Sequence, residues 1–317
     1  MARYPSEILI LGAGELGTAI AQAFASYRDA NPSKVLRLTI LRSGVRRNDS
    51  TSSELSTMDV KLVHMDIVGT TIEVLASTFS NYDTVISCLG FASGPALQMK
   101  IAEAAVQSTV KCFVPWQWGV DYDTIGRGSA MPLFDIQVDV RDLLRSKLGQ
   151  NGSSISDTGP SRRWIIISTG IFQSFIVLES YGVVVPSDTG TKKVRALGSW
   201  ETLTAVTRVE DIAQAAVAAV CVHPETKGII KIAGQNISYE ELAEVISRVT
   251  GKEVEKEMWG LDDLKKEQEQ EPNDVMRRYR VIFGGGKGVA WTREETWTAV
   301  QNMMGVEEWL RKYWIYE

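Results

Sequence analysis

A glycine-rich segment near the amino end of this 317-residue chain carries the residue types and spacing most directly tied to chemistry. It has the sequence Gly12-Ala13-Gly14-Glu15-Leu16-Gly17, between a β-type run at 7–11 and a helical pattern at 18–28. In such a turn the first glycine permits the bend, the second lets the backbone approach a pyrophosphate, and the third lets the helix pack closely. The helix N-terminus adds N–H donors and partial positive charge. The segment, with Glu15 and Leu16, predicts a dinucleotide-binding turn.

The residue that ends the second expected strand indicates which dinucleotide is bound. NAD-binding turns have an acidic residue at this place to bind the ribose 2′-hydroxyl. This chain has Arg42 there, and Arg46 and Arg47 follow in a polar stretch. Guanidinium groups bind phosphate through bidentate, charge-assisted hydrogen bonds, so NADP(H) is the predicted cofactor. Arg46 and Arg47 could equally be solvated loop residues.

Further candidate contacts to the dinucleotide lie at the ends of other expected strands. Asp66 follows the third strand and could contact the adenine edge or simply close a turn. Leu89 and Gly90 end the fourth strand. Ligands bind outside the carboxyl ends of strands in open α/β sheets, so these positions are expected to face the cofactor.

The elements that must position these residues alternate along the chain. Alternation of strands and helices calls for parallel pairing, right-handed crossovers and helices on both faces of a sheet. We therefore expect an α/β fold with a doubly wound parallel Rossmann sheet and a smaller, interleaved C-terminal substrate domain. The expected strands are 7–11, 35–42, 60–65, 84–90, 111–115 and 164–169, and the helices include 70–80, 95–108 and 132–148.

The domain boundaries follow from a change of composition after the sixth strand. Residues 1–169 are predicted to form the NADP-binding Rossmann domain, with 203–234 returning to it. Residues 170–202 and 235–317 are predicted to form the smaller substrate-binding domain.

Local signals in the second half of the chain are weaker. The stretch 170–200 is expected to be irregular, and 255–278 is charged enough to predict a solvated helical face. Capping boxes are expected at Ser238 with Glu241 and at Thr292 with Glu295, each opening a helix. The run Gly284-Gly285-Gly286-Lys287-Gly288 lacks the Ser or Thr of a phosphate loop and is predicted to be a plain loop.

Composition excludes several classes of function. A net charge of −5 gives no basic field for nucleic acid or a membrane surface. Two histidines and three cysteines without CxxC spacing leave little material for a metal site, a disulfide framework or a Ser/His/Asp triad. The apolar run at the amino end is too short for a membrane span. We expect a cytoplasmic monomer or homodimer without a metal.

Six segments of the chain resemble the isoflavone-reductase-like group of NmrA-like, atypical short-chain dehydrogenases. Phenylcoumaran benzylic ether and pinoresinol-lariciresinol reductases belong to the same group, and fungal aromatic alcohol reductase-like members look most similar. The resemblance runs nearly end to end and implies an NADPH-dependent oxidoreductase. It is carried by the glycine turn and by VISCLG (85–90), KCFVPWQWGVDYD (111–123), FDIQVDVRDLLR (134–145), IIISTGIF (165–172) and TRVEDIA (207–213).

The chain departs from that family pattern at two places. The plant reductases have approximately Phe-x-Pro-Ser-Glu-Phe-Gly where this chain has Trp116-Gln117-Trp118 before Gly119, so polarity and bulk both change. The second departure is the more serious. The resembling reductases carry Phe-x-x-Lys, whose lysine is their proposed general acid/base, whereas here Phe134 is followed three residues later by Gln137. An amide can orient a substrate or hydrogen-bond the nicotinamide, but it does not ionise near neutral pH. The remaining catalytic candidates are Tyr122 as proton donor and Asp121 or Asp123 as base or orienter, each against plain loop or capping roles.

Aromatic residues near the strand ends suggest the kind of substrate. Trp116, Trp118 and Phe172 are expected where the sheet opens toward the nicotinamide, which would give an aromatic substrate pocket. Core packing of the two tryptophans is the alternative.

The leading hypothesis is reduction of a small aromatic or phenolic metabolite of secondary metabolism by NADPH. Gln137 keeps two alternatives open. One is a catalytically silent NADP(H)-binding regulatory or sensor protein. The other is a non-redox isomerase or cyclase that retains the cofactor.

Overall fold

The first strand and the first helix lie directly before and after the glycine turn. β1 (Glu7–Leu11) is buried from Ile8 to Leu11, and α1 (Glu15–Ala30) buries Ile20 and Phe24. A run of leucine and isoleucine favours a strand that is covered on both faces, as in parallel sheets. The computed structural model describes residues 5–42, 55–90, 94–154 and 161–314.

A large sheet continues from β1 in both directions. Its strand order is β12-β7-β5-β4-β1-β2-β3, and β6 (Ser153–Ser154) adds to β7 in antiparallel fashion. The pairs β3–β2, β2–β1, β1–β4, β4–β5 and β5–β7 are parallel. This is the doubly wound Rossmann arrangement, so the predicted fold class is confirmed. The bounds are β2 Arg37–Arg42, β3 Val60–His64, β4 Thr84–Ser87, β5 Cys112–Val114, β7 Arg162–Ser168 and β12 Gly228–Lys231.

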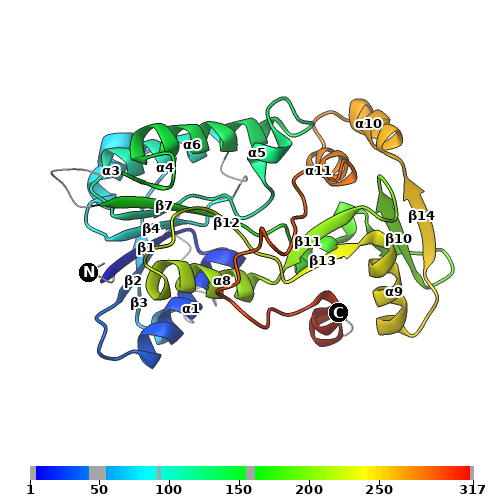
Figure 1. Cartoon of the computed structure of the whole chain (residues 1–317), viewed down its shortest axis with the longest axis horizontal. Coiled ribbons are helices and arrows are strands. Elements are labelled where there is room, and N and C mark those ends of the chain that lie inside the picture. Colours follow the sequence, from blue (N-terminus) through cyan, green and yellow to red (C-terminus); the bar gives the residue numbers. More distant parts are fainter. Residues whose placement is uncertain (1–4, 43–54, 91–93, 155–160, 315–317) are drawn as a thin grey trace. The chain divides into compact units, whose positions relative to one another are not determined.

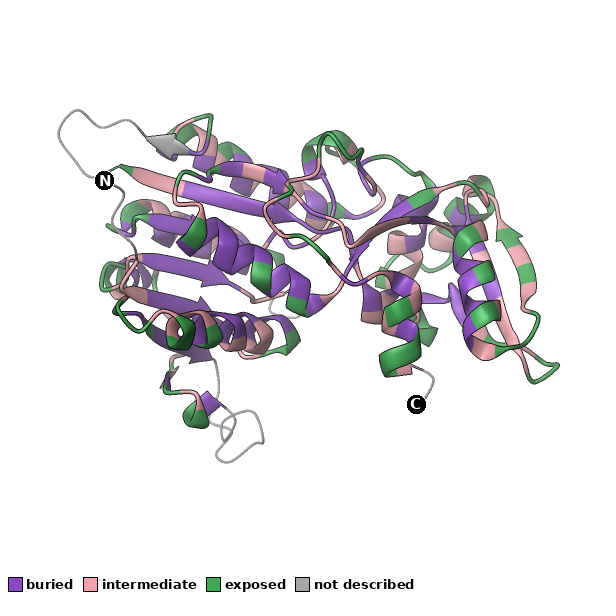
Figure 2. Cartoon of the chain, turned by 60° about the horizontal axis from the view of Figure 1, so that its bottom comes forward, coloured by how far each residue is buried: buried purple, intermediate pink, exposed green. Residues whose placement is uncertain are grey.

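Helices cover both faces of this sheet (Figure 1). α3 (Ile72–Phe79), α4 (Pro95–Gln107) and α6 (Pro132–Leu148) lie on one face, and α1 and α8 (Val209–Val217) lie on the other. The inner strands β1, β2, β4 and β5 are almost entirely buried, whereas the helices expose one side (Figure 2). Such amphipathic helices bury their apolar stripe against the sheet.

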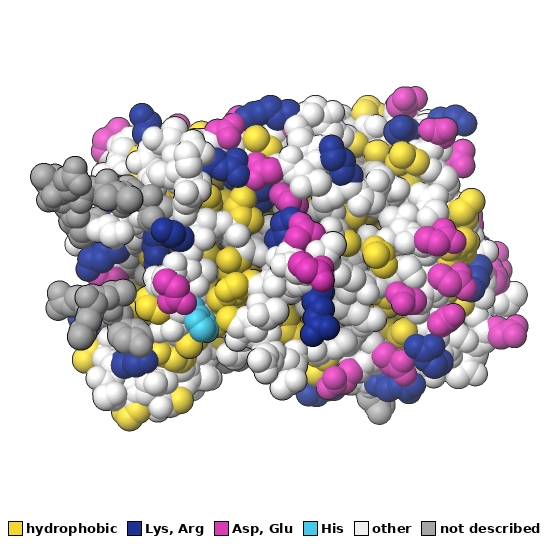
Figure 3. All heavy atoms as spheres, in the orientation of Figure 1, with side chains coloured by type: hydrophobic (Ala, Val, Ile, Leu, Met, Phe, Trp, Pro, Cys, Tyr) yellow, Lys and Arg dark blue, Asp and Glu magenta, His cyan; other side chains and the backbone are white. Residues whose placement is uncertain are grey.

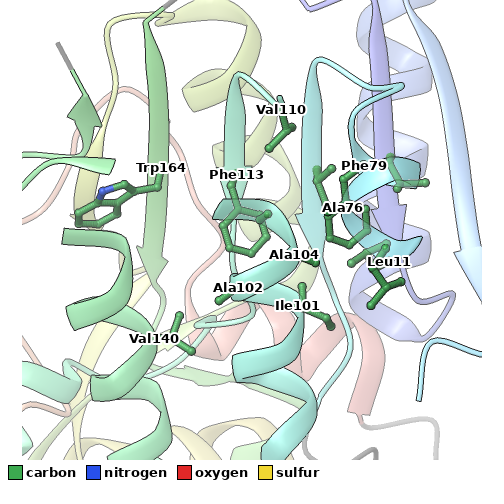
Figure 4. Packing of buried hydrophobic residues seen from close by; sticks show 14 of the residues in the cluster. Leu11, Ala76, Phe79, Ile101, Ala102, Ala104, Val110, Phe113, Val140 and Trp164 are labelled. Carbon is green, nitrogen blue, oxygen red and sulfur yellow. The ribbon is translucent and has the colours of Figure 1, made fainter. Parts of the chain in front are cut away.

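The core under α3, α4 and α6 draws on residues far apart in the chain. Phe79, Ile101, Phe113, Val140 and Trp164 belong to one buried cluster. Their side chains fill the layer between the helices and the strands (Figure 4). Because this cluster needs residues on both sides of position 118, the fold of the sheet depends on the chain returning to it.

The chain divides into two interleaved units. The first comprises 1–118, 136–167 and 212–230, and the second comprises 119–135, 168–211 and 231–317. Residues 119–135 and 203–211, which the sequence analysis groups with the dinucleotide-binding domain, thus lie in the second unit. That one domain binds NADP and the other binds the substrate stays a prediction.

Two small sheets and several helices form the second unit. One sheet has the order β14-β10-β9 and the other β13-β11-β8. The strands are β8 Ile171–Phe172, β9 Val184–Pro186, β10 Lys192–Leu197, β11 Leu203–Thr207, β13 Gln235–Ser238 and β14 Glu255–Trp259. The helices are α5 Tyr122–Ile125, α7 Gln173–Ile176, α9 Tyr239–Thr250, α10 Leu261–Gln270, α11 Val275–Gly284 and α12 Val306–Trp309.

Some local predictions for the second unit are confirmed and others are wrong. The Ser238–Glu241 capping box forms and opens α9. Thr292 and Glu295 also exchange their hydrogen bonds, but only a turn follows them. The stretch 170–200 contains β8, β9 and β10 instead of irregular chain, and 255–259 is a strand. Those strands are stabilised by partners distant in sequence, which local patterns do not reveal.

Acidic and basic side chains are interspersed on the face of the chain in Figure 3. Among the residues described, no helix combines the length and the apolar character needed to cross a membrane.

Candidate functional site

The glycine turn is held by main-chain contacts at the carboxyl end of β1. Gly12 has φ +99°, in the left-handed region that favours glycine, and its N–H donates to Leu41 O at 2.8 Å. A Cβ on Gly12 would lie 3.0 Å from Leu89 Cδ2. The turn therefore lies against the ends of both β2 and β4, where the strand order reverses. Ligands of doubly wound sheets bind at that switch point.

The other two glycines of the turn have different physical requirements. A Cβ on Gly17 would lie 2.1 Å from Gly12 O, so the close approach of α1 to the turn needs glycine there. Gly14 adopts an ordinary extended conformation, and a Cβ on it would meet nothing within 4 Å. Packing against the described residues does not explain Gly14. Open space beside the N-terminus of α1 fits an approaching phosphate group.

Arg42 lies where the sequence analysis places it. It is the last residue of β2 and is only 9% exposed. The preceding residue, Leu41, accepts the N–H of Gly12 in the glycine turn with its carbonyl. Arg46 and Arg47 lie outside the described residues. Glu15 is exposed and Leu16 is buried in the first turn of α1.

Asp66 closes a turn. Its Oδ1 accepts the N–H of Gly69 at 3.0 Å, and its carbonyl accepts the N–H of Thr70 at 2.9 Å. These contacts match the turn role that the sequence analysis left open beside an adenine contact.

The segment after β4 packs against the segment after β5. Leu89 O accepts Nε2 of buried Gln98 at 2.7 Å, and a Cβ on Gly90 would lie 3.5 Å from the Trp116 ring. Trp118 is 4% exposed and donates from Nε1 to Ser87 O at 2.8 Å. Trp118 thus has the packing role considered for it, while Trp116 is only half-buried.

A buried group of three polar side chains joins the loop after β5 to α6. Gln117 donates from Nε2 to the main-chain oxygen of Gln137 at 2.9 Å, and its Oε1 accepts Nε of Arg141 at 2.8 Å. All three residues are 0% exposed. We call this group the amide cluster. Neither the amide oxygen nor the amide nitrogen of Gln137 has a hydrogen-bond partner in the described part of the chain.

Asp121, in the second unit, forms an ion pair with Lys231. Its Oδ2 accepts Lys231 Nζ at 2.9 Å and Thr124 Oγ1 at 2.8 Å, and Lys231 also reaches Glu295 at 2.8 Å. Burial opposes the charge on Lys231, but Glu295 and Asp121 outweigh it and raise the pKa of Lys231. An aspartate fixed in this way serves better to hold the chain than to accept protons.

Tyr122 lies next to Asp121 within a group of aromatic rings of the second unit. It is 2% exposed, and its ring meets Phe134 edge-on at 4.9 Å between centroids. Phe134 in turn meets Tyr279 of α11 at 6.1 Å. Burial, and then the proximity of Tyr122, raise the pKa of Tyr279. Asp123 is exposed on the first turn of α5, and half-buried Phe172 ends β8.

The described residues contain no group of three or more His, Cys, Asp or Glu side chains arranged for a metal ion.

Comparison with known proteins identifies the family. Residues 5–310 match the NmrA-like family. The chain belongs to the NmrA-like family. An NmrA-like family domain-containing oxidoreductase of Gibberella moniliformis (strain M3125 / FGSC 7600) is 36% identical over 312 residues, covering 96% of this chain and 97% of that protein. The predicted family resemblance is therefore confirmed.

Solved reductases share the fold of this NmrA-like protein. An isoflavone reductase has a TM-score of 0.74 at 18% identity, with 97% of this chain and 99% of that chain covered. Leucoanthocyanidin reductase from Vitis vinifera, in binary complex with NADPH, has a TM-score of 0.75 at 18% identity, with 96% and 98% covered.

Sequence reasoning about this NmrA-like protein missed Gln117 as a site residue. The i, i+4 spacing of Gln137 and Arg141 places both on one face of α6, which could have been anticipated. The side chain that bridges them comes from the loop after β5, and no local pattern identifies it.

Proposed function

We propose that this NmrA-like protein is an NADP(H)-dependent reductase of a small aromatic or phenolic metabolite. The observation that carries the proposal is the junction of Arg42 and the glycine turn. Gly12 is hydrogen-bonded to the residue before Arg42, and Gly14 leaves open space at the N-terminus of α1. A 2′-phosphate and a pyrophosphate are the anions that such a junction suits.

The residues of the first unit are suited to hold the dinucleotide. Gly12, Gly14 and Gly17 would shape the pyrophosphate site, and the backbone of Glu15 and Leu16 would donate to it. Arg42 would pair with the 2′-phosphate, and Leu89 and Gly90 would line the switch point. When bound, the nicotinamide of NADPH supplies a hydride.

Proton delivery is assigned to the second unit. Gln137 does not ionise near neutral pH, so it is assigned to binding and orientation. Tyr122 has a phenolic hydroxyl that can donate a proton to a developing oxyanion. Water is the alternative proton donor. The Asp121–Lys231 pair would hold the start of α5 and thus the backbone of Tyr122.

An aromatic substrate is supported by the side chains and by the relatives. Half-buried Trp116 in the first unit and half-buried Phe172 in the second each offer ring surface. The two solved reductases are named after isoflavone and leucoanthocyanidin, which are aromatic compounds. Planar aromatic ligands stack on such side chains.

Arg42→Ala tests the cofactor assignment. Loss of a charge-assisted contact should weaken NADP(H) binding about tenfold to a hundredfold and leave NAD(H) binding nearly unchanged. Arg37→Ala, at the exposed start of the same strand, is the matched control and should leave both affinities unchanged. Titration calorimetry measures the dissociation constants of NADP(H) and NAD(H) for each variant. An equal loss of affinity for both cofactors in Arg42→Ala would contradict the 2′-phosphate site.

Gln137 also favours a second function, a silent NADP(H) sensor. The resembling enzymes carry an ionisable lysine at this place, whereas this chain has an amide. Incubation with NADPH and a panel of aromatic ketones, enones and benzylic ethers separates the two. Tight binding without NADPH oxidation by any compound would favour the sensor, and product formed without NADPH oxidation would favour an isomerase or cyclase.

A further inference from the structure

The amide cluster lies entirely within the first unit and joins two elements. Gln117 belongs to the loop after β5, while Gln137 and Arg141 lie one turn apart on α6. The two hydrogen bonds of the Gln117 amide, at 2.9 and 2.8 Å, use both its donor and its acceptor side. This side chain is therefore fixed in orientation.

Gln137 is in the opposite situation. Its main-chain oxygen is bound by Gln117, but its buried side-chain Oε1 and Nε2 find no hydrogen-bond partner among the residues that the structure describes. Buried polar groups in folded proteins are nearly always hydrogen-bonded. Two unpartnered atoms on one fully buried amide therefore call for a group that supplies a donor and an acceptor together.

We propose that the Gln137 amide pairs with a carboxamide of a bound ligand, and that Gln117 is the positioning residue that presents it. The inference rests on the proposed function because the dinucleotide is one of two possible sources of the carboxamide. The other source is an amide or lactam in the substrate.

Carboxamide is the chemistry that matches both atoms. Its N–H can donate to Gln137 Oε1 while its C=O accepts from Nε2, as in a pair of facing amides. A carboxylate offers acceptors alone and would leave Oε1 unpaired. A ketone has the same deficiency, and the unpaired buried acceptor would weaken binding.

Gln117 acts through the backbone of Gln137 and through Arg141. Its donor fixes the Gln137 carbonyl, and its acceptor holds the Arg141 guanidinium one turn along the helix. Without those bonds the first part of α6 would lose its attachment to the β5 loop. The Gln137 amide would then lose its fixed direction.

The first arm of the test compares NADP⁺ with its 3-acetylpyridine analogue, in which a methyl group replaces the carboxamide NH₂. If the nicotinamide is the partner, wild-type protein should bind the analogue about tenfold more weakly in titration calorimetry. Gln137→Met removes the amide at similar volume and should bind both compounds equally. Gln235→Met, a glutamine of β13 in the second unit that accepts the N–H of Val306, is the matched control and should discriminate like wild type.

The second arm detects a substrate source. Benzamide and acetophenone, which differ in the same NH₂ group, are titrated into protein saturated with NADP⁺. If the substrate supplies the carboxamide, benzamide should bind about tenfold more tightly than acetophenone, and Gln137→Met should abolish the difference.

Gln117→Met tests the positioning role. It should reduce the discrimination between carboxamide and methyl ketone while leaving the ratio of NADP⁺ to NAD⁺ affinity unchanged, a split that general destabilisation would not produce. Gln117→Glu keeps an acceptor for Arg141 but loses the donor to Gln137, so its discrimination should be intermediate.

Wild-type protein that distinguishes neither pair of compounds would overturn the inference, and this readout needs no variant to fold. Discrimination that persists in Gln137→Met would overturn it as well. Failure to bind NADP⁺ at all would instead contradict the proposed function.

Discussion

The environment of Tyr122 decides how its hydroxyl can act. The residue is buried, its ring is fixed against Phe134, and a Cβ on Gly119 would lie 3.2 Å from its hydroxyl oxygen. Glycine at position 119 therefore leaves room around the phenol. The neighbouring Asp121 is occupied by Lys231, so the phenol is the better candidate for proton donation.

Tyr122→Phe is expected to lower kcat about a hundredfold, because a positioned proton donor contributes about that much or more. NADP(H) affinity should stay unchanged in a fluorescence titration. Tyr279→Phe removes a hydroxyl from the same group of rings and is the control, with turnover close to wild type. Turnover unaffected in Tyr122→Phe would remove this residue from the mechanism.

Gly14 and Gly17 are expected to respond in opposite ways to alanine. Gly17→Ala places a Cβ against a fixed carbonyl and should lower the free energy of unfolding by about 1–3 kcal/mol. Gly14→Ala should leave that free energy nearly unchanged but weaken NADP(H) binding, since its Cβ would enter the proposed phosphate site. Urea unfolding and calorimetry measure the two effects. Gly14→Ala with wild-type affinity would argue against a phosphate at this turn.

At the scale of elements, one carboxylate ties together the amino ends of β1, β4 and β5. Asp83, just before β4, accepts the N–H groups of Ser6 and Glu7 at 2.8 and 3.2 Å. It also pairs with Lys111, just before β5, at 2.5 Å. Burial alone would raise the pKa of Asp83, but these partners outweigh it and lower the pKa to about 2.

Asp83→Asn should therefore destabilise the sheet in a pH-dependent way. A depressed pKa contributes stability that is fully present above the ordinary value of 3.8 and is lost as the pH falls through about 2. The difference in unfolding free energy between wild type and variant should be largest above pH 4 and shrink toward pH 2. Urea unfolding at a series of pH values checks this, and a difference that does not vary with pH would show that the charge has no role.

At the scale of the whole molecule, the chain passes repeatedly between two units. Each unit has three segments, so the chain crosses from one to the other five times. One crossing lies inside α6, between Asp135 and Ile136. Neither unit is a continuous stretch that could be cut out at a linker.

A fragment ending at residue 118 is expected not to fold. It would lack β7 and β12, and the core cluster would lose Val140, Leu144 and Trp164. The apolar faces of β5 and α4 would then stay exposed to water. Circular dichroism during thermal unfolding should show no cooperative transition for the fragment and one for the full chain. A cooperative transition in the fragment would mean that its five strands form an independent domain.

Elements with local signals could be predicted from the sequence alone. The glycine turn and the alternating hydrophobic runs predicted the Rossmann sheet, and the apolar spacing of 132–148 gave α6 its observed bounds. β14 was missed because its charged residues resemble a solvated helix. In the structure Glu255 and Glu257 stand opposite Lys193 and Arg195 of β10, some sixty positions earlier in the chain.

The site divides in the same way. Glycines at fixed spacing and an arginine at a strand end act through the backbone next to them, so the sequence was enough to propose the dinucleotide site. Only the tertiary structure showed that Asp121 is bound by Lys231, that Trp118 is packed against Ser87, and that Gln117 holds Gln137. Each of these contacts joins segments that are distant in sequence, and long-range packing decides which buried polar group finds a partner.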